Sequence, residues 1–178
     1  MKLIALLMLF TSSVWAKNLN YSYNQQSTLS GSWAEVVSLV AENISHFEVQ
    51  RCKVLDSYFT DIGDFKNCCL NPRQCEKSST FELMPKLILK DRFLIAGQWR
   101  GQISFDKIKA QINSNRPFII RFKSFDKQYV ALIEGYESNG DLHMIDPLEE
   151  KVITVSYDTL RLDGYKNSSW IGSYTIGY

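Results

Sequence analysis

One amphipathic segment near the beginning of the chain constrains the fold more than any other feature. Its apolar residues have the spacing i, i+3, i+4, i+7 and i+11, which is typical of one face of an α-helix: Trp33, Val36, Val37, Val40 and Ile44. Ser32 and Glu35 form the pattern S-x-x-E, a capping box that predicts a helix N-terminus at Ser32. Backbone N–H groups point outward at such a terminus and the helix dipole favours negative charge. The geometry suits an anionic nucleophile.

Helical patterns fill the first part of the chain, and strand patterns fill the last. The expected helices cover about 33–44, 47–59 and 105–112, with Ser104 as the N-cap of the third, and a short helical segment at 81–89 is interrupted by Pro85. The expected strands cover 118–122, 129–137, 141–145, 151–155 and 170–176, with a helical turn at 156–162. Asn139-Gly140 between two apolar runs predicts a hairpin. Helices followed by strands favour an α+β fold.

The first 16 residues have the pattern of a secretory signal peptide. Lys2 supplies the positive charge, 3–10 the apolar core, and Val14-Trp15-Ala16 a cleavage site. The apolar run is shorter than the about 20 residues that a membrane-spanning helix needs. We therefore expect cleavage after about Ala16 and a secreted or periplasmic mature chain without a membrane span, with a retained N-terminal anchor as the alternative.

The mature chain, 17–178, is expected to form a single domain with a helical part at about 17–115 and a sheet part at about 116–178. The whole chain has 20 Lys and Arg against 19 Asp and Glu, so loss of Lys2 leaves 19 of each kind. A net charge of zero offers no electrostatic attraction for nucleic acid or an anionic membrane. We expect neither as a partner, and no cofactor.

Export makes the four cysteines candidates for disulfide bonds. They lie within one short stretch: Cys52, Cys68, Cys69 and Cys75. The adjacent Cys68 and Cys69 are unfavourable partners for each other because that bond is strained. Cys52 is therefore expected to bond with one of them and Cys75 with the other, and the sequence leaves both pairings open. A zinc site is the competing interpretation, but the spacing without a nearby histidine matches zinc sites poorly, so no metal is expected.

Motifs in both halves of the chain resemble papain-like cysteine peptidases, especially the bacterial branch akin to the double-glycine leader peptidases. That family commonly reads G-H-x-V-x-I-x-G-Y, followed by a turn and a strand that ends in Asp-Pro. Here the corresponding strand runs from Gln128 to Tyr136, and Gly135-Tyr136 and Asp146-Pro147 set the register. Gln26 lies six residues before Ser32, and Trp33 follows Ser32, as around the catalytic cysteine of the family. The cysteine cluster also resembles a disulfide-bearing bacterial branch. The resemblance implies a helical lobe packed on an antiparallel sheet.

The resemblance also implies a role for each of these positions. Gln26 corresponds to the oxyanion-hole glutamine, which donates to the developing negative oxygen. Ser32 stands in place of the nucleophilic cysteine, and Tyr129 in place of the histidine base. Asp146 keeps the orienting acid, and Trp33 is expected in the core or the cleft wall. Two of the three catalytic groups are therefore changed.

These two changes predict a loss of catalysis. A serine hydroxyl is a poor nucleophile unless a base removes its proton. Tyrosine, with an ordinary pKa of about 10, is a poor base near pH 7. His46 lies 14 residues beyond Ser32, about 21 Å along a helix at 1.5 Å per residue. His143 precedes Asp146 by three residues in a strand and should face the other side.

Each of these residues also has an ordinary structural interpretation. Ser32 can be a helix cap, and Tyr129 can fill the space of the histidine and hydrogen-bond to Asp146. Asp146 can be a strand-ending turn residue, and Gln26 can be structural. Glu134, in an apolar strand, is expected to face solvent.

Three hypotheses for function follow from the sequence. The favoured one is an exported, catalytically inactive papain-like domain that binds a peptide or protein segment in the former active-site cleft. The second is a degenerate peptidase or hydrolase that uses Ser32 as its nucleophile. The third is a structural or immunity-type partner of an exported protein, which uses a surface away from the cleft.

Overall fold

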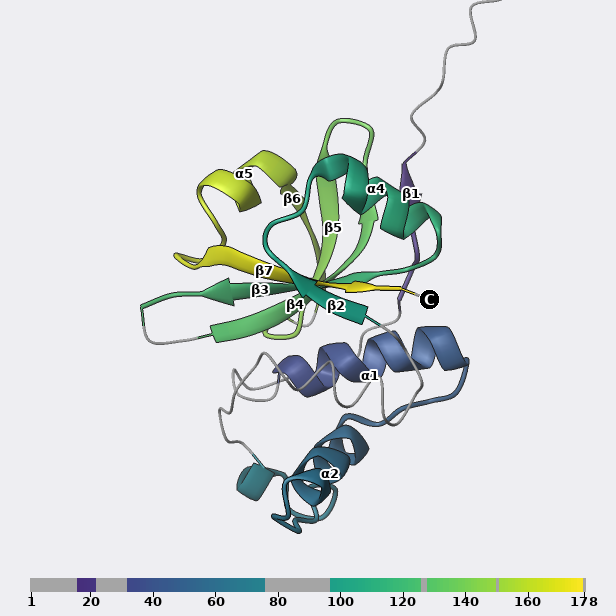
Figure 1. Ribbon diagram of the computed structural model, residues 1–178, viewed down its shortest axis with the longest axis vertical. Coiled ribbons are helices and arrows are strands. Elements are labelled where there is room, and N and C mark those ends of the chain that lie inside the picture. Colours follow the sequence, from purple (N-terminus) through teal and green to yellow (C-terminus); the bar gives the residue numbers. More distant parts are fainter. Residues whose placement is uncertain (1–15, 22–31, 76–96, 126–127, 150, 178) are drawn as a thin grey trace, which may run out of the picture.

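A computed structural model describes residues 16–21, 32–75, 97–125, 128–149 and 151–177. Figure 1 shows a sheet with helices on both of its faces. Gln26, most of the expected signal peptide and the expected helical segment at 81–89 lie outside the described residues.

The sheet is seven-stranded, and all of its neighbouring strands run antiparallel. Six strands follow the order β2-β7-β3-β4-β5-β6, and the short β1 pairs with the end of β4. Their bounds are β1 Lys17–Asn18, β2 Gly97–Arg100, β3 Phe118–Lys123, β4 Gln128–Tyr136, β5 Asp141–Asp146, β6 Lys151–Ser156 and β7 Ser169–Ile176. The expected strands after Pro117 are therefore confirmed, with small shifts at their ends.

Helix α1 (Ser32–Ser45) covers one face of the sheet, and α2 (Arg51–Asp61) packs on the outer side of α1 (Figure 1). The apolar side of α1 joins Val130 and Leu132 of β4 in one buried cluster. The expected helix at 33–44 is confirmed, because burial of this apolar stripe against the sheet removes it from water.

Two further helices, α4 (Phe105–Asn113) and α5 (Tyr157–Leu162), cover the opposite face. Both have serine N-caps: Ser104 accepts a hydrogen bond from the backbone N–H of Lys107, and Ser156 accepts one from that of Thr159. The N-cap expected at Ser104 is confirmed. Ile108, Ile112 and Leu160 belong to a second buried cluster on this side.

Strand β4 is buried on both faces, which explains an expectation that was wrong. Glu134 was expected to face solvent, yet it is only 1% exposed. The chain around β1 covers it: the N–H of Leu19 donates to the Glu134 carbonyl at 3.0 Å, and the N–H of Tyr21 donates to the Glu134 carboxylate at 2.8 Å. Burial raises the pKa of Glu134, and the hydrogen bond from the Tyr21 backbone opposes that shift.

The helical part differs from the prediction in two other places. The second helix begins at Arg51 instead of about 47, because a left-handed residue, His46 (φ 58°), follows α1, and Phe47 after it is 76% exposed. Strand β2 comes from the part expected to be helical, and it is too short to produce a recognisable period in the sequence.

Two disulfide bonds join the loop after α2 to that helix and to itself. The pairs are Cys52–Cys69 and Cys68–Cys75, one of the two pairings that the sequence left open. The short 3₁₀ helix η2 (Pro72–Cys75) completes this loop. Among the described residues there is no group of three or more potential metal ligands, and no helix there has the length and apolarity to cross a membrane.

Truncation of Leu132 tests the central packing. Leu132 of β4 is fully buried against α1, so Leu132→Ala removes apolar contacts and leaves a cavity. We expect it to lower the free energy of unfolding by about 2–5 kcal/mol. Urea denaturation followed by circular dichroism measures this loss.

Val152→Ala in the edge strand β6 is the control, because Val152 is 40% exposed. Its expected loss is less than about 1 kcal/mol. Equal losses in the two variants would contradict the assignment of β4 as the centre of the core.

Candidate functional site

The first residues of α1 are buried. Ser32 is the first residue of the helix, one position earlier than the apolar pattern indicated. Trp33 packs edge-to-face on Tyr58 of α2, with ring centroids 5.3 Å apart, and is a core residue. The capping-box position Ser32 thus lies at a helix N-terminus as predicted, but beneath the surface.

A buried carboxyl lies one turn further along the same helix. Glu35 is 5% exposed, and its Oε2 atom has no hydrogen-bond partner among the described residues. Burial raises the pKa of Glu35 to about 7, Arg51 opposes the shift, and Glu42 adds to it. The sequence had identified Glu35 only as part of a capping box. Its burial depends on the tertiary packing around α1, which no local pattern reports.

The structure brings Tyr129 and Asp146 to the same face of the sheet. Leu132 pairs with Ile145 on the α1 side, so the next residue, Asp146, faces the opposite side together with Tyr129. Tyr129 is 4% exposed and stacks on Phe122 with centroids 5.1 Å apart. Burial raises the pKa of Tyr129 above its ordinary value, the Asp146 carboxylate adds to the rise, and the nearby Ser168 hydroxyl opposes it.

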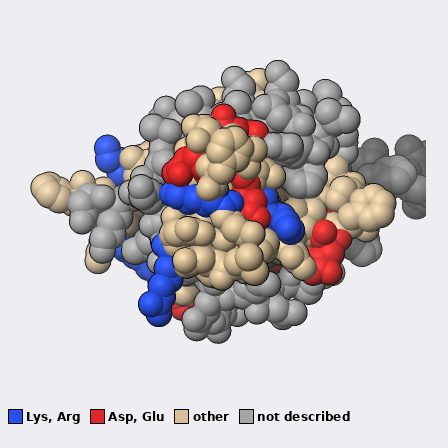
Figure 2. All heavy atoms as spheres, turned by 90° about the horizontal axis from the view of Figure 1, so that it is seen from below, with Lys and Arg blue, Asp and Glu red and all other residues tan. Residues whose placement is uncertain are grey.

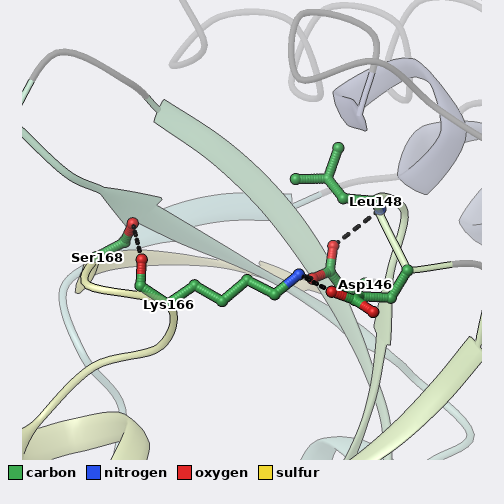
Figure 3. Close-up of polar contacts among 5 residues, drawn as sticks. Asp146, Leu148, Lys166 and Ser168 are labelled. Atoms are coloured by element: carbon green, nitrogen blue, oxygen red, sulfur yellow. Dashed lines mark hydrogen bonds and ion pairs between the residues drawn. The ribbon is translucent and has the colours of Figure 1, made fainter.

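The hydrogen bond expected from Tyr129 to Asp146 is absent. The Tyr129 hydroxyl has no hydrogen-bond partner among the described residues. The Asp146 carboxylate, which is fully buried, is occupied by other donors: the N–H of Leu148 at 2.9 Å and the ammonium of Lys166 at 3.0 Å (Figure 3).

Lys166 is the residue that sequence reasoning missed. Its ammonium contacts both Asp146 and Glu149. Partial burial works against the charged form, but the hydrogen bonds with Glu149 and Asp146 prevail and raise the pKa of Lys166. The group is therefore a permanent cation near neutral pH. No motif in the chain indicated it, because Lys166 lies 20 residues from Asp146 in a loop.

The two histidines take no part in this arrangement. His143 lies on the α1 side of β5, opposite to Asp146 as predicted, and its Nε2 lies 2.7 Å from the Glu137 carboxylate. His46 follows the last turn of α1, at the far end of the helix from Ser32. Two adjoining hollows of about 450 and 320 Å³ also lie at that far end and share Asn43 and His46.

Four positions of the expected cleft lie within the described residues. Ser32, Trp33, Tyr129 and Asp146 are all buried. Trp33 is enclosed by the packing of α1 on α2, and Asp146 by Lys166 and the chain at Leu148. Trp33 was expected in the core or the cleft wall, and it lies in the core. A cleft beside these residues stays a prediction.

No protein-family model matches the sequence, and no curated protein matches it. Solved structures do share its fold. A putative C39-like peptidase from Bacillus anthracis superposes with a TM-score of 0.60 at 12% identity, over 92% of this chain and 98% of that one. The peptidase domain of Streptococcus ComA, a bi-functional ABC transporter involved in a quorum sensing pathway, gives 0.53 at 14% identity, over 89% and 100%. The chain has the α+β fold of C39-like peptidases, as the resemblance implied.

The buried carboxyl of Glu35 predicts a pH-dependent stability. Its pKa is 4.5 in an exposed chain and about 7 in the folded protein. The folded state therefore binds more protons at Glu35 between these values, so the contribution of Glu35 to stability is greatest below pH 4.5 and falls until about pH 7. Glu35→Gln cannot ionise and should escape this fall. We expect the variant to gain about 3 kcal/mol over the native protein between pH 4 and pH 8.

Urea denaturation of both proteins at pH 4, 6 and 8 measures the difference. Glu48→Gln, at an exposed position, is the matched control and should follow the native protein. Parallel curves for the native protein and Glu35→Gln would show that Glu35 ionises normally.

Proposed function

We propose that the mature chain is an exported, catalytically inactive domain with the C39-peptidase fold that binds a peptide or protein segment. The observation that carries this proposal is the environment of Asp146. The acid is present, but its partner is the Lys166 ammonium, and the base position holds Tyr129 with a raised pKa.

The chemistry of these groups supports inactivity. A serine nucleophile needs a base that accepts its proton near neutral pH. The raised pKa of Tyr129 means that its phenol is protonated there and donates instead of accepting. His143 faces the other side of the sheet and contacts Glu137. We therefore propose that the domain binds a polypeptide without cleaving it.

Export rests on the N-terminal pattern of residues 1–16 and is supported by the cysteines. All four are paired in the two disulfides, and such bonds persist in oxidising compartments. Figure 2 views the molecule from the side of α2, and acidic and basic side chains lie next to one another there. This face therefore lacks the single-sign charge that attracts nucleic acid, and a polypeptide is the partner that we propose.

A peptidase assay tests the inactivity directly. The native mature protein, 17–178, and its Ser32→Ala variant are incubated with a broad peptide library, and new termini are detected by mass spectrometry. We expect no cleavage above background with either protein. Cleavage by the native protein that Ser32→Ala abolishes would overturn the proposal and establish the alternative, a serine hydrolase.

Binding is tested with the same library. Peptides retained by the native protein are added to it, and backbone hydrogen exchange is measured. We expect protection at the beginning of α1 and at the beginning of β4, next to Ser32 and Tyr129. Protection confined to other surfaces would contradict binding at the former active site and favour a partner that uses another face.

A further inference from the structure

Lys166 lies in a turn that does not favour lysine. The loop before β7 reverses within a two-residue turn, in which the N–H of Tyr165 donates to the Ser168 carbonyl at 2.8 Å and the N–H of Ser168 donates back at 2.9 Å. The two central residues, Lys166 and Asn167, both have a positive φ, 49° and 57°. This is a type I′ turn, in which Asn, Asp and Gly are favoured at both positions. Asn167 fits that preference, and Lys166 does not.

A long side chain in the left-handed region is strained, and it persists where surrounding contacts hold it. The contacts of Lys166 are at the far end of its side chain. Figure 3 shows the chain extended from the turn toward Asp146, with the ammonium against that carboxylate. Glu149, from the turn after β5, approaches the same ammonium. The turn thus places the Lys166 ammonium beside the Asp146 and Glu149 carboxylates.

The Asp146 carboxylate requires a cation as its partner because it is buried. Asp146 is fully buried, whereas the Lys166 side chain is 38% exposed. A buried carboxylate is costly without a charged partner, and removal of one member of such a pair leaves the other uncompensated. The remaining neighbours of Asp146 include the Tyr129 and Tyr165 side chains, whose pKa values the negative charge raises. Among these groups, Lys166 is the cation.

We propose that Lys166 is a positioning residue that takes the place of an imidazole as the partner of Asp146, and so is a third change in this site beside Ser32 and Tyr129. The inference rests on the proposed function in treating the site as a former catalytic one. It follows that Ser32→Cys with Tyr129→His does not rebuild a catalytic pair while the Lys166 ammonium is bound to the Asp146 carboxylate.

An imidazole introduced by Tyr129→His tests whether Lys166 competes with it for the Asp146 carboxylate. The Lys166 ammonium lies at the carboxylate that would stabilise an imidazolium, so it disfavours the protonated ring. Removal of that ammonium by Lys166→Met leaves the imidazole as the available partner. We expect the pKa of the introduced imidazole to rise by at least one unit, a tenfold change in its protonation constant, from Tyr129→His to Tyr129→His with Lys166→Met.

Proton NMR titration of the C2–H signal measures this change in the full mature chain. The signals of His46 and His143 are internal references, and Tyr129→His with Lys53→Met is the control for loss of one positive charge at an exposed site. The same pKa with and without Lys166 would overturn the proposal. Peptidase activity in the native protein would overturn the proposed function and leave this result unaffected.

A second pair of variants avoids the change at Tyr129. If Lys166 serves only as a turn residue, Lys166→Asn suits the left-handed conformation better and should keep or raise the melting temperature. The proposal predicts a lower melting temperature for Lys166→Asn and a value close to the native one for Lys166→Arg, which keeps the charge. An unchanged or raised melting temperature in Lys166→Asn would overturn it.

A comparison of peptidase rates in restored variants is a further test. The proposal predicts that Ser32→Cys with Tyr129→His stays at background in the peptidase assay and that addition of Lys166→Met increases its rate. Equal rates above background in the two proteins would contradict the role of Lys166.

Discussion

The packing of α1 against strand β4 is the interaction on which the rest of the structure depends. β4 has buried residues on both faces: Val130 and Leu132 face α1, and Ala131 and Ile133 face the cluster beneath α4 and α5. Burial of this much apolar surface in one central strand holds both helical layers to the sheet. It also decides the site, because Ser32 begins the helix and Tyr129 lies near the start of the strand.

Among the residues that the structure describes, three carboxyl groups are buried around this core, and each is accommodated differently. Asp146 has the Lys166 ammonium and a backbone N–H as partners. Glu134 accepts a backbone N–H from Tyr21. Glu35 has one oxygen without a partner among the described residues, and its raised pKa shows that it is readily protonated near neutral pH. A buried carboxyl is thus stabilised by a cation, by a backbone hydrogen-bond donor or by protonation.

The fold of this protein does not by itself establish its chemistry. Its fold is that of C39-like peptidases, yet the identities of 12% and 14% to the solved structures establish the fold alone. Function depends on the groups placed on a fold. Here the Asp146 carboxylate is paired with Lys166, and the Tyr129 phenol stacks on Phe122 without a hydrogen bond to Asp146. The core is formed mainly by other residues, so the packing of the fold does not depend on these two side chains.

The sequence by itself determined the elements whose signals are local. The apolar stripe from Trp33 predicted α1, Ser104 predicted the cap of α4, and Asn139-Gly140 predicted the β4–β5 hairpin, in which Gly140 has a φ of 93°. Periodicity and turn chemistry act over a few residues, so they can be read along the chain.

Only the tertiary structure decided the disulfide pairing, the burial of Glu134 and the partner of Asp146. Each depends on segments that are distant in sequence: Tyr21 lies 113 residues from Glu134, and Lys166 lies 20 residues from Asp146. A lysine in a polar loop carries no local sign that its ammonium reaches a buried acid, because that contact depends on how the strands pair and where the loop is held.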